Sequence, residues 1–508
     1  MATHPMLDVG TLPYRDDMTV FSEVVEPVVF SQTFCRFRLS NTKGILDSNS
    51  KLQLTCTNSG LHRAPAGGGA DVNQTMSSFL PVGTGIHSLI ERAELLIGGK
   101  IICSIDDNPF FQTIKKGFHP TDDRWGLDQC YEGDYLASQI GQGQNNGNAC
   151  NKAQLMTRRK LPRSLLITNQ DTTTPSFSIS LGDLFPFMRR KQLPLYLIDE
   201  PVTLQLTFTN KDQQGAMACY NQEVTNAATN AASDVTIDQV GCKLFLDYLI
   251  YDNEKMEELR GEMATKGLSF IYEDTLLVKK AMEAQPLATS AHEQNLELGG
   301  QGRIVRGILV GATNETTVGT AAVPGAPRKL LGNYMMNAEE GGFEINWRFN
   351  DKRLFNRDCD KDSVKHYLLS QVEANGGYWV PKPYMSYELH DGTATAGVDV
   401  LTNTCAVVGA AAGQNSGCDF EGNTNVAGAN TQLHEQLRGT MSPYGVWVAP
   451  HHYNAAGSGL LIGSKPIICE FKRTGAGATP ANAVEMLRFW IIFERHFVLR
   501  DGKIYISY

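Results

Sequence analysis

The segment ELLIGGKIICSID, from Glu94 to Asp106, decides between two fold classes. Its Gly-Gly-Lys could belong to a phosphate-binding loop, which has the form G-x-x-x-x-G-K-[ST] and precedes a helix. Here the first glycine position holds Glu94, whose carboxylate would repel phosphate, and the hydroxyl position holds Ile101. The β-branched run after Lys100 is a poor helix start, whereas two apolar runs joined by Gly-Gly predict a β-hairpin. The segment therefore favours an all-β protein over a nucleotide-binding enzyme.

Apolar and polar residues alternate in several further segments. The alternation is clearest in SFSISL (176–181), VTLQLTF (202–208) and FEINWRFN (343–350). A period of two buries one face of a strand and leaves the other in water. Such strands are typical of antiparallel β-sandwiches and not of parallel sheets that are buried on both faces.

Helical signals are scarce, and the clearest lies near the middle of the chain. In DNEKMEELRGEMATKG, Asp252 is expected to cap the start of a helix and Gly267 to close its end. Met256, Leu259 and Met263 fall on one face of this helix. A shorter helix is predicted from Asp362, in DSVKHYLLSQVE. Long loops rich in Gly, Ala, Asn and Thr separate the predicted strands.

Three motifs recur in the same order on either side of the central helix, which indicates a duplicated unit. LLIGGKIIC, with Lys100, resembles WRFNDKRLF, with Lys352, because both read as strand, two-residue turn, lysine and strand. Two more pairs follow in order: LYLIDEPVTLQLTFTNK with GLLIGSKPIICEFKRT, and CKLFLDYLIYD with MLRFWIIFERHFVL. The sequence therefore predicts two sandwiches of similar topology in one chain.

Composition restricts the partners of the protein. The 508 residues are 42% hydrophobic and 19% charged, with a formal net charge of −9. An acidic chain without a basic tail is not expected to bind nucleic acid directly. We interpret two short basic clusters as solvated faces or subunit contacts. These clusters are Arg158, Arg159 and Lys160, and Arg189, Arg190 and Lys191.

The 11 cysteines include no C-x-x-C pair, and their number is odd. Cys35, Cys56 and Cys469 fall on apolar strand faces, which predicts reduced, buried thiols in an intracellular compartment. We find no signal-peptide pattern and no apolar run near the ~18 residues that a membrane helix needs.

A candidate calcium loop fails on its later positions. Asp358, Asp360 and Asp362 have the spacing of the first three ligands. The loop then requires glycine and a bidentate glutamate, where this chain has Ser363 and Leu369.

Other candidate motifs lack the context that their chemistry needs. His451-His452 has no H-E-x-x-H frame, Ser458 has no G-x-S-x-G frame, and GQGQNNG from Gly141 has the wrong third spacing. Adjacent carboxylates point apart on extended chain, so the acidic pairs are interpreted as solvated: Asp106-Asp107, Asp122-Asp123 and Glu339-Glu340. We predict no catalytic residue, no metal site and no cofactor.

The chain resembles the major capsid proteins of the double jelly-roll lineage, most closely those of polinton-like viruses and virophages. The resemblance covers about residues 30–508. It rests on LIERAELLIGGKII, LPLYLIDEPVTLQLTF and EKMEELRGEMATKG in the first part of the chain. In the second part it rests on FEINWRFNDKRLF, GLLIGSKPIICEF and RFWIIFERHFVLRDGKIYIS.

This resemblance implies two tandem eight-stranded jelly rolls with short connecting helices and long loops. It divides the chain into an N-terminal arm (1–29), a first jelly roll (30–251), a connecting helix (252–267) and a second jelly roll (268–508). It further implies homotrimeric, pseudo-hexameric capsomers that tile the icosahedral shell of a DNA virus. Neighbouring capsomers, penton proteins and minor capsid proteins would be the partners. The protein would be assembled in the host cell and reside in the virion.

Two alternatives belong to other functional classes. A tandem β-sandwich can bind or cleave glycans, which would require exposed aromatics and paired acids in one groove. A minor vertex protein usually carries one jelly roll, so the duplication argues against it. If residues 1–28 form a docking arm, their removal should leave soluble trimers but impair closure of the shell.

Overall fold

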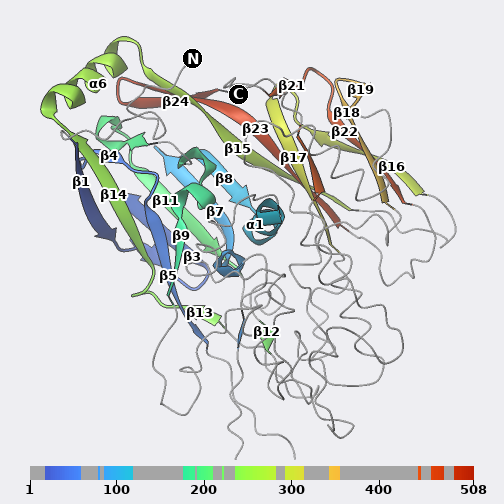
Figure 1. The fold of residues 1–508 in the computed structure, drawn as a ribbon, viewed down its shortest axis with the longest axis horizontal. Helices are drawn as coiled ribbons and strands as arrows, with labels where there is room; N and C mark the ends of the chain where they lie inside the picture. Colours follow the sequence, from blue (N-terminus) through green and yellow to red (C-terminus); the bar gives the residue numbers. More distant parts are fainter. Residues whose placement is uncertain are drawn as a thin grey trace, which may run out of the picture.

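The computed structural model describes residues 18–58, 78–79, 85–117, 176–188, 192–209, 220–221, 235–281, 292–313, 343–354, 444–447, 459–473 and 486–507. These residues form two antiparallel β-sandwiches that lie side by side (Figure 1). Helix α6 (Asn253–Thr265) connects the last strand of the first sandwich to the first strand of the second. None of the described helices is long and apolar enough to cross a membrane.

The first sandwich has the strand order of a jelly roll. We letter its eight main strands B to I in chain order. One sheet has the order B-I-D-G, formed by β1 (Met18–Val25), β14 (Lys243–Tyr251), β5 (Lys51–Asn58) and β9 (Ser176–Ser180). The other has the order C-H-E-F, formed by β3 (Phe34–Leu39), β11 (Val202–Phe208), β7 (Ile90–Ile97) and β8 (Lys100–Asp106).

Short strands extend these two sheets. β4 (Ile45–Leu46), β10 (Leu193–Pro194) and β13 (Val235–Ile237) join the B-I-D-G sheet, and β2 (Val29–Phe30) joins the C-H-E-F sheet. A separate two-stranded ladder pairs β6 (Ser78–Phe79) with β12 (Tyr220–Asn221).

The second sandwich repeats the same order of strands. Its B-I-D-G sheet contains β15 (Leu268–Ala281), β23 (Met486–Arg500), β17 (Ile304–Thr313) and β20 (Tyr444–Trp447). Its C-H-E-F sheet contains β16 (His292–Gly299), β22 (Ile467–Arg473), β18 (Phe343–Phe349) and β19 (Lys352–Arg353). β21 (Leu460–Leu461) and β24 (Lys503–Ser507) pair with β17 and β23. The predicted fold of two eight-stranded jelly rolls is therefore confirmed.

The three recurring sequence motifs occupy equivalent strands of the two sandwiches. The first pair forms the E–F hairpins β7–β8 and β18–β19. Their turn residues have positive φ, at 59° and 79° for Gly98 and Gly99 and at 51° and 64° for Asn350 and Asp351. These angles suit a two-residue hairpin turn, so the expected hairpin is confirmed. The second and third pairs form the H strands and the I strands.

Alternating burial builds the cores. On β11, Val202, Leu204, Leu206 and Phe208 are buried, as the alternation predicts. The long strands β15 and β23 run from the first sandwich into the second (Figure 1) and contribute to both cores. In β23, Phe497 packs in the first core, while Ile491 packs in the second. One pair of strands is thus shared by the two sandwiches.

The other helices are short. They are α1 (Asn108–Gly117), α4 (Leu181–Leu184) and the 3₁₀ turns η2 (Gly85–Leu89), η6 (Pro186–Met188) and η7 (Leu195–Leu197). In α6, Leu259 and Met263 are buried, as predicted, and Gly267 closes the helix at φ 75° with its N–H donating to the Glu262 carbonyl. Asp252 occupies the N-cap position, as predicted, but its exposed side chain makes no capping hydrogen bond.

The N-terminal boundary also differs from the expectation. The resemblance implies that residues 18–25 belong to an arm, but they form β1, which pairs with β14 along all eight residues. The strand has no clear alternation of apolar and polar residues in the sequence, because β1 lies at a sheet edge. Val20 and Val24 are 52% and 51% exposed there. The remaining boundaries fall between elements, since β14 ends at Tyr251 and β15 begins at Leu268.

Candidate functional site: the junction between the two sandwiches

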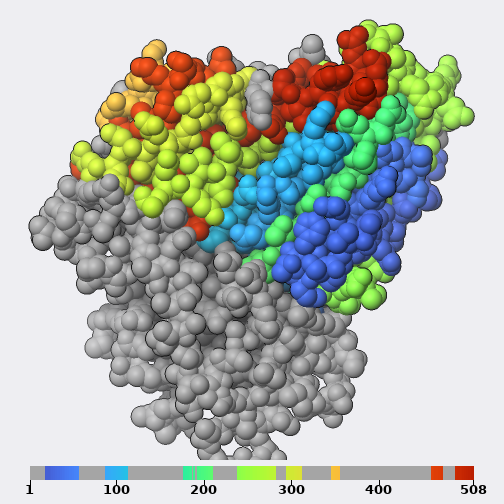
Figure 2. Space-filling model, turned by 180° about the vertical axis from the view of Figure 1, so that it is seen from behind, coloured from blue at the N-terminus to red at the C-terminus, as the bar shows by residue number. Residues whose placement is uncertain are grey.

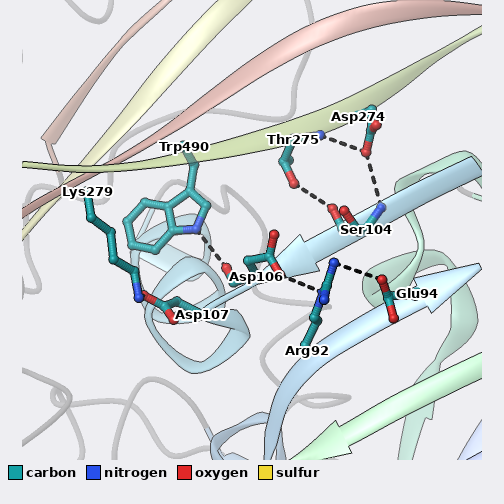
Figure 3. Close-up of polar contacts among 9 residues, drawn as sticks. All are labelled: Arg92, Glu94, Ser104, Asp106, Asp107, Asp274, Thr275, Lys279 and Trp490. Atoms are coloured by element: carbon teal, nitrogen blue, oxygen red, sulfur yellow. Dashed lines mark hydrogen bonds and ion pairs between the residues drawn. The ribbon is translucent and has the colours of Figure 1, made fainter. Parts of the chain in front are cut away.

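The two sandwiches meet at a surface that we call the junction. The first sandwich contributes β8, Asp107 and the start of α1, and the second contributes β15 and β23. In the space-filling view, the light-blue segment that includes β8 lies directly against yellow and red atoms of the second half (Figure 2). Figure 3 shows several of the polar contacts at and beside this surface.

The junction covers the free edge of a sheet. β8 is the last strand of its sheet, and a free edge exposes backbone N–H and C=O groups that invite unwanted pairing. Side chains of the second sandwich bind these groups at every other residue, at Ile102, Ser104 and Asp106. These three carbonyl groups therefore have hydrogen-bond donors, as a folded interior requires.

The contacts with this edge are short and come from both long strands. The Ile102 carbonyl accepts from the Tyr272 hydroxyl at 2.7 Å and from Arg495 Nη1 at 2.9 Å. The Ser104 carbonyl accepts from Thr275 Oγ1 at 2.8 Å.

At the other end of the edge, the Asp106 carbonyl accepts from Trp490 Nε1 at 3.0 Å (Figure 3). The same indole ring lies 6.2 Å from the ring of Phe111 on α1. Trp490 thus combines a hydrogen bond with apolar packing across the junction.

Asp274 is a buried carboxylate of the junction. It accepts from the Ser104 N–H at 3.2 Å and the Thr275 N–H at 2.9 Å, and it pairs with Arg495 at 2.8 Å. Burial raises the pKa of Asp274 to about 6, although the Arg495 charge opposes this shift. The carboxylate therefore orders the β8 backbone and pairs with a partly buried guanidinium.

Asp107 carries the ion pairs between the sandwiches. Its carboxylate lies 2.7 Å from Lys279 Nζ and 2.9 Å from Arg488 Nε. Burial alone would raise the pKa of Asp107, but the hydrogen bonds and charges of Lys279 and Arg488 hold it below its ordinary value. The solvated role expected for this residue is wrong, because Asp107 is only 6% exposed. Its neighbour Asp106 instead pairs with Arg92 at 2.7 Å and remains partly exposed.

A second carboxyl group adjoins this ion pair. Burial and the neighbouring Asp107 raise the pKa of Glu91 to about 7. A protonated Glu91 relieves the repulsion between the two carboxyl groups. The balance of charge at this end of the junction therefore depends on pH near neutrality.

Aromatic packing and backbone contacts extend the junction. The Phe187 ring lies 5.1 Å from Phe270 and 5.2 Å from Phe497, so both long strands pack on the first core. At the start of β8, Lys100 Nζ donates to the Ile504 carbonyl at 3.4 Å. These contacts give the junction a structural role, which is to hold the two sandwiches at one orientation.

The junction has almost no signal in the local sequence. Asp274, Arg488 and Arg495 each contact residues far away in the chain, so no short motif indicates their role. The one local signal is the interruption of an apolar run by charged residues in RFWIIFERHF. Buried charges within a core strand indicate a specific partner.

Several predicted features lie outside the described residues. They are the second helix, Asp122-Asp123, Glu339-Glu340, both basic clusters, the segment from Gly141, Asp358, Asp360, Asp362, His451-His452 and Ser458. Within the described part of the chain, no group of three or more His, Cys, Asp or Glu residues could hold a metal ion. The buried free thiols of Cys35, Cys56 and Cys469 agree with the sequence prediction.

Comparisons with known proteins identify the fold. No protein-family model matches the chain, and no curated protein matches its sequence. The 3.5 Å cryo-EM structure of the Sputnik virophage matches 100% of this chain and 92% of its own, with a TM-score of 0.57 at 9% identity. The quasi-atomic model of the PBCV-1 virus capsid matches 98% of both chains, with a TM-score of 0.54 at 12% identity. The chain therefore has the double jelly-roll fold of these viral capsid proteins.

Proposed function

We propose that the protein is a major capsid protein that builds the shell of an icosahedral DNA virus or virophage. One observation carries this proposal: two complete jelly rolls with the same strand order are joined in one chain, as in the capsid neighbours. The likeness extends over nearly the full length of both chains, so it involves the entire building block.

The junction supports this role physically. A shell subunit must transmit contacts from one neighbour to the next without bending, and the junction fixes the orientation of the two sandwiches through buried hydrogen bonds and ion pairs. Three such chains supply six sandwiches of similar shape. A homotrimer would therefore have a nearly hexagonal outline and could pack edge to edge in a shell.

The partners follow from this role. Copies of the same chain form the trimer and surround it in the shell, while penton and minor capsid proteins fill positions that a hexagonal unit cannot. The net charge of −9 makes direct binding to the genome unfavourable, so packaging would rely on other proteins or counterions. The protein would be made in the host cell, reside in the virion and act without catalysis or a cofactor.

Within the described part of the chain, no surface favours the glycan-binding alternative. Glycan recognition would need several exposed aromatic rings on one surface. Phe21 and Phe245 are exposed on neighbouring strands, but the β1–β14 register places them on opposite faces of the sheet. Tyr505 is exposed on β24, the edge strand of the second sandwich's sheet.

Electron microscopy of the purified full-length protein tests the proposal. We expect threefold particles with six lobes of density, alone or within closed shells. A glycan array probed with the same preparation serves as the control for the alternative. Elongated two-lobed monomers that bind a defined glycan would contradict a capsid role.

A further inference from the structure

Two thiols from opposite sheets of the first sandwich are in contact. Cys35 lies on β3 in the C-H-E-F sheet, and Cys242 immediately precedes β14 in the B-I-D-G sheet. Their Sγ atoms are 3.7 Å apart, and both side chains are fully buried. We propose that Cys35 and Cys242 are a modification site, at which exchange with a small-molecule disulfide forms a cross-link between the two sheets.

The surrounding backbone already holds the two segments together. The Gln32 side chain donates to the Ile237 carbonyl at 3.0 Å and accepts from the Ile237 N–H at 3.1 Å. This two-point contact lies three residues before Cys35 and five before Cys242. From their separation of 3.7 Å, the two Sγ atoms must approach to about 2.05 Å to form the bond, and this contact keeps their segments close together.

The closed fold protects both thiols. The hydrogen bond with Cys242, together with burial, raises the pKa of Cys35 well above its ordinary value. Since the thiolate is the reacting species, exchange must wait for a local opening. The turn before Cys242 offers a route, because Val240 within it is 70% exposed. Formation of the cross-link is therefore slow and limited by opening of this turn.

The exchange of the two cysteines with the small disulfide takes place in two steps, which together conserve atoms and electrons. When the turn opens, one thiol of the pair loses its proton and attacks a sulfur of the small disulfide. This step forms a mixed disulfide and releases one small thiol, which takes up the proton. The other cysteine then attacks the protein sulfur of the mixed disulfide, forms the Cys35–Cys242 bond and releases a second small thiol. The two cysteines are oxidised, and the small disulfide is reduced to two thiols.

The cross-link would stabilise the first sandwich. It joins residues that are 207 positions apart, so it removes much of the conformational freedom of the unfolded chain. An increase in melting temperature on the order of 10 °C is expected for a loop of this size. A reductant would reverse the increase, so the stability of this half of the protein would follow the redox state of its surroundings.

Among the described cysteines, Cys56 is a competitor, because it is buried on β5 and Cys242 contributes to raising the pKa of its thiol. The sequence also places Cys219 and Cys242 on one tryptic peptide, from Asp212 to Lys243. Fragment spectra of linked peptides must therefore assign the bond to one residue of that peptide.

The experiment incubates the folded, full-length protein with oxidised glutathione and maps disulfides by mass spectrometry without reduction. We expect one dominant link between Cys35 and Cys242, a higher melting temperature and reversal by dithiothreitol. Urea below the unfolding transition should speed the reaction, because it promotes opening. Cys242→Ala should abolish the product, whereas Cys469→Ala, which removes a buried thiol of the second sandwich, should not change it.

Three outcomes would overturn the proposal. They are a dominant link from Cys242 to Cys56, glutathione adducts without an internal link, and a cross-linked product that melts at or below the temperature of the reduced protein. Because mapping uses the unmodified chain, the result does not depend on whether a cysteine variant folds.

Discussion

Replacing Asp107 by asparagine should weaken the junction without changing its shape. Asparagine has nearly the same volume and tolerates the φ of 50° found at this position. The change removes the carboxylate that lies 2.9 Å from Nε of Arg488, which is 7% exposed. Removing one member of a buried ion pair costs about 3–5 kcal/mol. A remaining hydrogen bond to the amide oxygen returns about 1 kcal/mol, and the half-exposed Lys279 adds little. We therefore expect a loss of about 2–4 kcal/mol in the free energy of unfolding.

Thermal melts of wild type and variant at equal protein concentration measure this loss, since assembly makes the melting temperature depend on concentration. A loss of this size lowers the melting temperature by roughly 5–10 °C. Glu257→Gln is the matched control, because its ion pair with Arg260 is exposed and should contribute at most about 0.5 kcal/mol. Addition of Arg488→Met should cost less in the Asp107→Asn background than in wild type. Equal melting temperatures for Asp107→Asn and Glu257→Gln would refute the reasoning.

Three further predictions concern the same framework. The raised pKa of Glu91 means that the folded protein binds the proton of this carboxyl group more tightly than the unfolded chain does. The stabilising effect of this proton is therefore complete below pH 4.5 and is lost as the pH rises through about 7. Glu91→Gln should make the urea midpoint depend less on pH across this window. Trp490→Phe should lower the free energy of unfolding by about 1–2 kcal/mol in urea titrations, because the Asp106 carbonyl loses its indole donor. Tyr272→Phe should cost less, because Arg495 still donates to the Ile102 carbonyl that the hydroxyl contacts. Equal costs for the two variants would contradict this reasoning. Deletion of residues 1–28 should lower solubility and the melting temperature, because it removes β1. A fully stable 1–28 deletion would show that β1 contributes little.

The fold could be predicted from sequence where local signals sufficed. Gly-Gly and Asn-Asp tolerate positive φ, so both E–F hairpins were visible as turns between apolar runs. The order of the three repeated motifs then indicated the duplication. Alternation located strands such as β11, whose two faces differ in burial. Both signals depend on residues that are close together in the chain.

The remaining features depend on tertiary contacts. β1 escaped detection because its valines are exposed at a sheet edge, so its two faces do not differ enough in polarity. The role of Asp107 was missed because its partner Arg488 lies 381 residues away and comes close only when the second sandwich packs on β8. The deletion of residues 1–28, designed on the sequence to test an arm, also removes a strand and therefore cannot test the arm alone.

The native mass of the purified protein tests the central claim most directly. Size-exclusion chromatography with light scattering should give a species of three times the 55.8 kDa chain mass, or particles in the megadalton range. Either result is expected if this rigid pair of jelly rolls is a capsid building block. A monomer that persists across a wide range of concentration would contradict self-assembly into capsomers.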